Sequence, residues 1–317
     1  MTTVVFMGTP QFAVPILQGV IDHGYQVLAV VTQPDRIVGR KKILQMSPVK
    51  QAALMNNIPV LQPEKISGSE EMQKIEIMQP DIIITAAYGQ FLPTSLLNSA
   101  KIAAINVHGS LLPKYRGGAP IQYAIKNNDT ETGITIMYMA KKMDAGDIIT
   151  QASLPILPTD DAGSIFDKLS YLGRDLLLTT LPKIIDGTAP RLPQDESKVT
   201  FAYNIKPCEE QIDINWPATK INGLVRALRP QPGAYCNFNG KRTKIWQIEV
   251  SDETADVQPG TVIVRTKKSL IIAAGDHTAF AIICLQPAGK AKQPIQAYLN
   301  GLGRNIKMGD KVITNDN

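Results

Sequence analysis

Two side chains suited to carbonyl chemistry stand two residues apart at the end of an apolar segment. Asn106 carries a primary amide and His108 an imidazole, and the preceding residues Ile102–Ile105 predict a buried strand. Because side chains at positions i and i+2 of a strand share a face, both groups are expected to enter one pocket. An amide N–H beside an imidazole suits attack on a carbonyl group, where negative charge develops on oxygen.

A carboxylate that could complete this site lies further along the chain. Asp144 sits in the turn Met143–Asp147, after a predicted strand over 132–138, and can approach His108 if neighbouring strands align. A carboxylate paired with an imidazole orients the ring and favours its charged form. Two other interpretations stay open: Asp144 could cap its own turn, and His108 could be a buried structural histidine.

The elements that must position these residues follow an alternating pattern of strands and helices. An amphipathic stretch over 12–23 follows the first strand and the turn at Gly8, and helices are also predicted over 48–55 and 162–185. Neither a dinucleotide glycine fingerprint nor a phosphate-loop lysine follows the first strand. The near-continuous apolar segments predict a sheet covered on both faces, with strands at 3–8, 27–31, 81–86 and 102–107.

The chain divides into two predicted domains. The first is expected to span residues 1–188, and residues 189–206, which contain Pro190 and Pro193, predict a linker draped over the surface. Residues 207–317 contain short strand candidates separated by Gly and Asp turns, a spacing typical of a small β-barrel. The predicted class is therefore an α/β domain followed by a β-barrel domain.

Composition narrows the environment of the protein. Three scattered cysteines without metal-like spacing indicate free thiols in a reducing cytoplasm, and neither a signal sequence nor a membrane-spanning segment is present. The net charge of +5 arises mainly after residue 206, where basic groups recur between apolar segments. This distribution suits a polyanion-binding surface, although ordinary solvated lysines would give the same excess.

A long polar insertion follows the second predicted strand. Residues 33–42 exceed the usual length of a loop between strand and helix, and the basic side chains among them could clamp phosphates. A solvated mobile loop would have the same charge. The four basic residues are Arg36, Arg40, Lys41 and Lys42.

Assembled in order, these motifs resemble the methionyl-tRNA formyltransferases, which belong to a wider group that moves one-carbon units from 10-formyltetrahydrofolate. The resemblance extends nearly end to end. The Asn, His and Asp set alone indicates only the wider group, whereas the basic insertion and the C-terminal segment narrow it to the tRNA enzymes. The matching segments are Phe6–Pro10, Gln33–Arg36, Ser47–Lys50, Ala87–Gly89, Asn106–Pro120, Glu131–Gly133, Met143–Asp147 and Leu285–Lys290.

The resemblance implies a Rossmann-like formyltransferase domain followed by an oligonucleotide-binding-type barrel that holds tRNA. It implies catalytic roles for Asn106, His108 and Asp144, and tRNA contacts for the basic residues Arg36, Arg40, Lys41 and Lys42. The residues expected to border the folate are Tyr88, Gly89, Gln90, Phe91 and Leu92 in one segment and Ser110, Leu111, Leu112 and Pro113 in another.

The expected reaction is formyl transfer from 10-formyltetrahydrofolate to the free α-amino group of methionyl-initiator tRNA. It gives N-formylmethionyl-tRNA for translation initiation, without a metal, in a cytoplasmic monomer that has no membrane partner. Two alternatives are a formyltransferase acting on a small amine, such as glycinamide ribotide or an amino sugar nucleotide, and a tRNA-binding protein without catalysis. Activity on free small amines would favour the first, and salt-sensitive tRNA binding without turnover the second.

Overall fold

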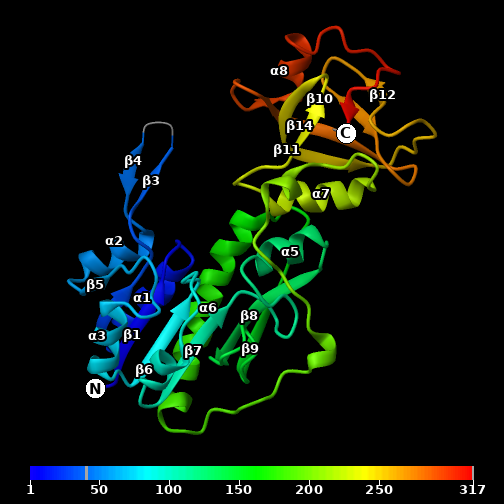
Figure 1. The fold of residues 1–317 in the computed structure, drawn as a ribbon. Helices are drawn as coiled ribbons and strands as arrows, with labels where there is room; N and C mark the ends of the chain where they lie inside the picture. Colours follow the sequence, from blue (N-terminus) through cyan, green and yellow to red (C-terminus); the bar gives the residue numbers. More distant parts are fainter. Residues whose placement is uncertain (40–41, 316–317) are drawn as a thin grey trace. The chain divides into compact units, whose positions relative to one another are not determined.

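The computed structural model describes residues 1–39 and 42–315, which form two compact units (Figure 1). The first unit comprises Met1–Pro120, Glu131–Pro155 and Phe166–Tyr203. The second comprises Ile121–Thr130, Ile156–Ile165 and the chain from Asn204 onward. The second unit thus includes two short pieces that precede residue 188 in the sequence, and the predicted boundaries at 188 and 206 remain predictions.

A mixed sheet forms the centre of the first unit, in the order β5-β2-β1-β6-β7-β8-β9. The strands from β5 to β7 are parallel, and β8 and β9 extend the sheet antiparallel. The predicted α/β fold is confirmed, because parallel strands alternate with helices along this unit. The strands in the middle of the sheet are apolar and buried, as expected for such a sheet. The strands are β1 (Thr3–Gly8), β2 (Gln26–Val31), β5 (Val60–Leu61), β6 (Ile82–Ala86), β7 (Ala103–His108), β8 (Glu131–Tyr138) and β9 (Ile148–Pro155).

Close packing of helices against this sheet depends on small residues. A Cβ atom on Gly8 would lie 2.8 Å from the Cβ of Ala13 and 2.9 Å from the carbonyl oxygen of Ala86, so only glycine lets the first helix approach so closely. Ser47 begins the second helix by accepting a hydrogen bond from the backbone N–H of Lys50. The helices are α1 (Ala13–Asp22), α2 (Pro48–Met55), α3 (Glu70–Met78), α4 (Thr94–Asn98) and α6 (Ala162–Ile185).

The polar insertion contains a hairpin that the sequence pattern did not indicate. β3 (Arg36–Val38) pairs antiparallel with β4 (Ile43–Gln45), and Figure 1 shows the two strands projecting from the first unit. Ile37, Ile43 and Leu44 are 65%, 59% and 65% exposed. This hairpin, of which residues 36–39 and 42–46 are described, is therefore an arm with uncovered apolar side chains.

An antiparallel sheet in the order β12-β13-β14-β11-β10-β16 dominates the second unit. A bridge between Thr261 and Lys311 joins the two ends of this order, so the sheet closes toward a barrel, as predicted. Its elements are α5 (Pro120–Lys126), α7 (Ala218–Ala227), β10 (Tyr235–Phe238), β11 (Lys241–Ser251), β12 (Val262–Arg265), β13 (Leu270–Ala273), β14 (Ala279–Pro287), β15 (Gln293–Pro294), α8 (Ile295–Asn300) and β16 (Ile313–Thr314).

Candidate active site

Strand β7 places Asn106 and His108 on one face of the sheet. Val107, between them, faces the other way and lies against α6, where a Cβ atom on Gly173 would be 3.0 Å from Val107 Cγ1. This alternation is the ordinary geometry of a strand. The amide and the imidazole therefore project together from the carboxyl end of β7, where ligands of α/β sheets commonly bind.

The carboxylate of Asp144 lies beside both groups. Its Oδ1 atom is 3.5 Å from Asn106 Nδ2 and 3.7 Å from His108 Nδ1, and its Oδ2 atom accepts a 2.9 Å hydrogen bond from the backbone N–H of Gly117. The side chains of His108 and Asp144 are 6% and 16% exposed. The structure thus brings together the three residues that were proposed for catalysis, in a largely buried cluster.

The amide of Asn106 is oriented by a neighbour on β6. Thr85, which is buried, donates its hydroxyl hydrogen to Asn106 Oδ1 at 2.8 Å. Because that hydrogen bond occupies the amide oxygen, the Asn106 NH2 group faces Asp144. Thr85 was not assigned a role from the sequence, since its pairing with Asn106 depends on the register of two parallel strands.

The loop after β7 holds the imidazole from the other side. His108 Nε2 lies 3.0 Å from the carbonyl oxygen of Tyr115, so Nε2 carries a hydrogen and donates it. Nδ1 is directed at Asp144 but stays beyond hydrogen-bond distance. Asn106 Nδ2 and His108 Nδ1 therefore both have long contacts with Asp144, and Nδ1 is a donor only in the doubly protonated ring.

Ser110–Pro113, which were expected to border the folate, are fixed to β8 and β9. The hydroxyl of Thr135 donates to the carbonyl oxygen of Ser110 and accepts from the backbone N–H of Leu112. Gln151 Nε2 donates to the carbonyl oxygen of Leu112 at 2.8 Å. This segment is consequently a rigid wall next to His108.

The second expected folate segment, Tyr88–Leu92, follows β6, the parallel neighbour of β7. Tyr88 and Leu92 belong to the hydrophobic core, whereas the side chain of Phe91 is exposed. Burial, with a smaller contribution from Glu71, raises the pKa of Tyr88 to about 12, so its phenol stays neutral. Gly89 and Phe91 are the exposed residues of this segment, whereas the carbonyl oxygen of Tyr88 already accepts hydrogen bonds from Thr9 and Gln33.

Two basic residues of the insertion, Arg36 and Lys42, lie on the β3–β4 arm. Arg36 forms an exposed ion pair with Glu64, in which Nη2 and Oε2 are 2.6 Å apart. Lys42 is exposed at the start of β4 and has a positive φ of 50°. Arg40 and Lys41 lie outside the described residues.

The second unit has a surface that combines basic and aromatic side chains. The sequence predicted its positive charge but not the aromatic rings beside the basic groups. Two ammonium groups lie near the ring of Trp246, Lys292 Nζ at 5.0 Å and Lys244 Nζ at 5.5 Å from its centroid. The guanidinium of Arg242 stacks 3.6 Å from the centroid of Tyr235. Positive groups interleaved with aromatic faces are typical of surfaces that bind nucleic acid.

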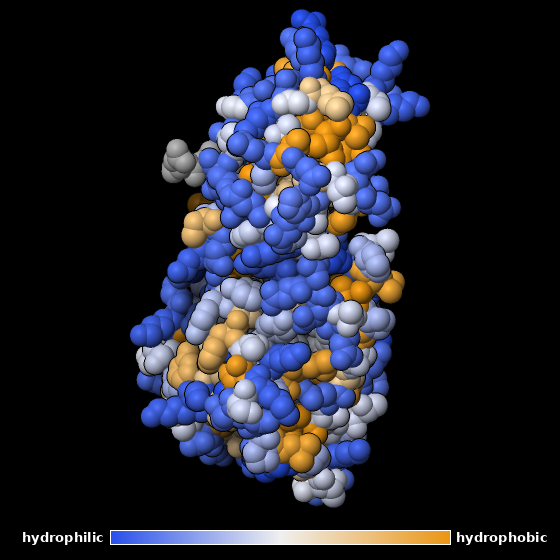
Figure 2. Space-filling model, turned by 90° about the vertical axis from the view of Figure 1, so that its right-hand side faces the viewer, coloured by the Kyte–Doolittle hydropathy of each residue, from blue (hydrophilic) through white to orange (hydrophobic). Residues whose placement is uncertain are grey.

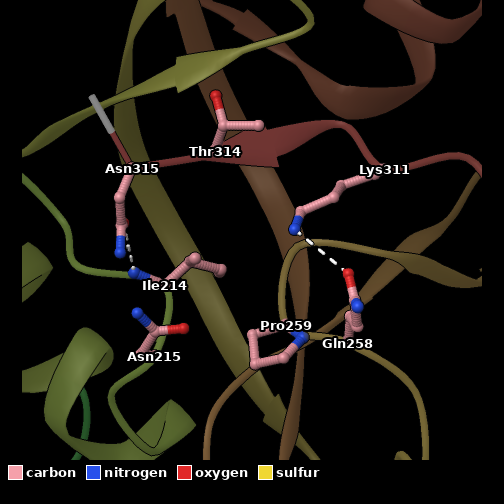
Figure 3. Close-up of a pocket in the computed structure, with 7 residues that line it drawn as sticks. All are labelled: Ile214, Asn215, Gln258, Pro259, Lys311, Thr314 and Asn315. Atoms are coloured by element: carbon pink, nitrogen blue, oxygen red, sulfur yellow. Dashed lines mark hydrogen bonds between the residues drawn. The ribbon is translucent and has the colours of Figure 1, made fainter. Parts of the chain in front are cut away.

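A separate pocket of the second unit contains none of the predicted site residues. Two hydrogen bonds join residues that line it: Lys311 Nζ donates to Gln258 Oε1, and the side-chain oxygen of Asn315 accepts from the backbone N–H of Ile214 (Figure 3). Asn215, Pro259 and Thr314 also line this pocket. It adds nothing to the chemistry at β7.

Hydrophilic side chains cover most of the face drawn in Figure 2, with apolar areas between them. Across the described part of the chain, each helix is too short or too polar to cross a membrane. In the same residues, no three His, Cys, Asp or Glu side chains are grouped to hold a metal ion.

Comparison with protein families gives matches over both halves of the chain. The Formyl transferase family matches residues 1–181, and the Formyl transferase, C-terminal domain family matches residues 204–303. The methionyl-tRNA formyltransferase of Latilactobacillus sakei is 63% identical over 316 residues, which cover 100% of this chain and 99% of the relative. The enzyme of the same name from Ligilactobacillus salivarius is 59% identical over 317 residues, covering 100% of both.

Solved structures at low identity share the fold. The sugar 3N-formyl transferase WlaRD, crystallised in the presence of dTDP and 5-N-formyl-THF, has a TM-score of 0.67 at 21% identity and covers 92% of this chain and 99% of its own. HypX from Aquifex aeolicus in complex with tetrahydrofolic acid has a TM-score of 0.64 at 16% identity, covering 99% of this chain and 50% of its own.

Proposed function

Because the chain belongs to the methionyl-tRNA formyltransferase family, we propose that it transfers a formyl group from 10-formyltetrahydrofolate to the α-amino group of methionyl-initiator tRNA. The product is N-formylmethionyl-tRNA, which serves translation initiation. The observation that carries the proposal is the cluster at the end of β7, where Asn106 Nδ2 and His108 Nδ1 both face the carboxylate of Asp144. This cluster can stabilise an oxyanion and receive a proton within one buried site.

Asn106 and His108 supply the electrostatic part of the reaction. The formyl carbon is attacked by the neutral amine, and its oxygen gains negative charge. When the tetrahedral intermediate collapses, the bond between the formyl carbon and N10 of the folate breaks, and N10 takes up a proton to leave tetrahydrofolate. Asn106 Nδ2 and a protonated His108 would donate to that oxygen, because both donors have long contacts with Asp144 that can be exchanged for substrate contacts. One such donor typically contributes about 100- to 1000-fold in rate.

Asp144 supplies the complementary negative charge. It stabilises the positive charge of the imidazolium and, through water, accepts the proton that the amine releases. The hydrogen bond from the Gly117 N–H holds Oδ2, so Oδ1 is the oxygen that faces the donors and the incoming amine. Asp144 therefore has a fixed orientation before substrate arrives.

The folate donor is assigned to the two segments that follow neighbouring parallel strands. Tyr88–Leu92 after β6 and Ser110–Pro113 after β7 end at the same edge of the sheet, next to Asn106. Exposed Phe91 offers an aromatic face to a pterin ring. No metal takes part in the proposed reaction.

The tRNA is assigned to the arm and to the basic surface of the second unit. On the arm, Arg36 and Lys42 are exposed cations beside uncovered apolar side chains, and Arg40 and Lys41 belong to the same insertion. On the second unit, Trp246 with Lys244 and Lys292 provides stacking and charge. We assign the protein to the cytoplasm, as a monomer.

Formyl transfer by the purified chain tests this function. With 10-formyltetrahydrofolate as donor, methionyl-tRNA and free small amines are offered as competing acceptors, and the formylated products are measured. We expect methionyl-tRNA to be the acceptor. Transfer to an amino sugar nucleotide or glycinamide ribotide with indifference to tRNA would replace the proposed acceptor, and salt-sensitive tRNA binding without any transfer by folded protein would refute catalysis.

A further inference from the structure

Residues 191–202, which precede the second family match and follow the first, lie against the active-site loop. The backbone of Arg116 donates to the carbonyl oxygen of Thr200 at 2.9 Å and accepts from the N–H of Ala202 at 2.8 Å. Gly117 has a φ of +129°, and a Cβ atom there would lie 2.5 Å from the carbonyl oxygen of Ala202. The segment predicted to be a surface linker is therefore paired with the loop that contains Tyr115, whose carbonyl oxygen accepts the hydrogen bond from His108.

Arg116 extends this contact with a fully buried guanidinium. Its side chain is 0% exposed, and its Nε and Nη2 atoms donate to Gln194 Oε1 at 3.0 and 2.8 Å. Glu196 accepts from Nη2 at 2.8 Å, and this hydrogen bond lowers the pKa of Glu196. A buried charge is tolerated only when paired, so the 194–196 segment is a required partner of the loop.

The amide nitrogen of Gln194 contacts the backbone of the turn that carries Asp144. Its Nε2 atom donates to the carbonyl oxygens of Asp144 and Gly146, both at 2.8 Å. Asp144 has a φ of +48°, a conformation that residues other than glycine adopt at an energetic cost. The two hydrogen bonds from Gln194 hold the turn in this conformation, which directs the carboxylate at His108.

We propose that Gln194 is a positioning residue for formyl transfer, joining the buried Arg116 to the backbone of the Asp144 turn and so fixing the carboxylate next to His108 and Asn106. The inference rests on the proposed function for its catalytic consequence. Its structural part stands on the Arg116–Gln194–Asp144 contacts alone. Its amide bonds to the backbone of Asp144 and Gly146 and to the Arg116 side chain, so Gln194 acts through the Asp144 turn.

Replacing the amide while keeping its volume tests the role. Gln194→Met removes both donors and the acceptor, whereas Glu196 still pairs with Arg116, which favours a folded variant. We expect kcat to fall by about 100-fold, since a small misplacement of a catalytic group has an effect of that size. The KM values for both substrates should stay close to those of the wild type. Loss of substrate binding with unchanged kcat would overturn the proposal.

The adjacent residue gives a matched control. Asp195 caps the short turn at Glu196–Lys198 by accepting hydrogen bonds from the backbone N–H and the hydroxyl of Ser197. Within the described part of the chain, its side chain forms no hydrogen bond with Asp144. Asp195→Ala should therefore change kcat by no more than about twofold, as is usual for surface substitutions. A loss equal to that of Gln194→Met would mean that any disturbance of the segment suffices, which overturns a specific role for Gln194.

A double-mutant cycle separates positioning from general structural support. In an Asp144→Ala background, Gln194→Met should lower the single-turnover rate by less than about threefold, because the group that Gln194 positions is gone. An equal loss in both backgrounds would overturn the proposal.

Hydrogen exchange tests the contact without any reaction. The N–H of Gly117 donates to Asp144 Oδ2, so Gln194→Met should raise its exchange rate by about tenfold if the turn loosens. If the wild-type chain transferred no formyl group, the proposed function would fail while this measurement still decided the positioning. Unchanged exchange at Gly117 would overturn the positioning, whatever the activity.

Discussion

The cluster at the end of β7 and the β3–β4 arm are opposites in burial and in bonding. Around Asp144, every side chain of the proposed reaction is held by a neighbour: Asn106 by Thr85, and His108 by the carbonyl oxygen of Tyr115. On the arm, Leu44 and Ile37 are each 65% exposed. The side chains of the β7 cluster are thus held in a fixed geometry by hydrogen bonds, whereas the arm exposes apolar side chains to solvent.

The difference shows how one chain can separate chemistry from recognition of a large partner. Stabilising an oxyanion requires donors that are oriented before the substrate arrives, and the cluster at the end of β7 is accordingly buried and held by hydrogen bonds. Contact with a macromolecule requires surface, and exposed apolar side chains commonly mark such a site. Substitutions in the first region should therefore change the rate of transfer, and substitutions on the arm should change affinity for tRNA.

The largest effect is expected from the oxyanion donor. Asn106→Ala should lower kcat by about 100- to 1000-fold, while the KM for methionyl-tRNA stays near that of the wild type. Steady-state transfer rates over a range of tRNA concentrations measure both. A rise in KM with unchanged kcat would assign Asn106 to binding.

A smaller loss of kcat is expected from a change at Thr85, which acts through its hydrogen bond to Asn106. Thr85→Val keeps the shape of the side chain but leaves Asn106 Oδ1 without the hydroxyl that orients it, so kcat should fall about tenfold. Thr85→Ser retains the hydroxyl and is the control. If Val and Ser gave equal rates, the orientation of Asn106 would not depend on this hydrogen bond.

Replacing an exposed apolar side chain of the arm should lower the affinity for methionyl-tRNA. Leu44→Ser is expected to raise the KM for methionyl-tRNA by about fivefold and to leave kcat unchanged, because the side chain contributes contact area only. Ile77→Ser, at an 81% exposed position of α3, is the matched control and should have no effect. Equal KM values for these two variants would remove the arm from the tRNA contact.

The smallest effect concerns a single charge on the second unit. Lys292→Ala should reduce the slope of log affinity for tRNA against log salt concentration by about one, as expected for one lost phosphate contact. Lys74→Ala on α3 serves as control. A binding titration at several salt concentrations gives the slope, and an unchanged slope would exclude Lys292 from the contact.

The sequence predicted those parts of the fold that depend on local pattern. The apolar run before Asn106 identified β7, the alternation of its side chains placed Asn106 and His108 together, and Ser47 with Pro48 identified the start of α2. The fold class is confirmed. Short elements with weak periodicity were missed, among them α8 and the β3–β4 hairpin.

The support of the site was not readable from the sequence, for a physical reason. Gln194 bonds to Asp144 across 50 residues of chain and to Arg116 across 78, and Thr85 bonds to Asn106 across 21. No local pattern marks such long-range hydrogen bonds. Arg116 stood in a loop rich in special residues, but only the structure shows that its guanidinium is buried and faces Gln194.

The separation of chemistry from recognition is tested most directly by measuring the single-turnover transfer rate and the tRNA dissociation constant on two variants, Asn106→Ala and Leu44→Ser. The account predicts that Asn106→Ala lowers only the rate at saturating tRNA and that Leu44→Ser weakens only binding. A loss of both rate and affinity in both folded variants would contradict it.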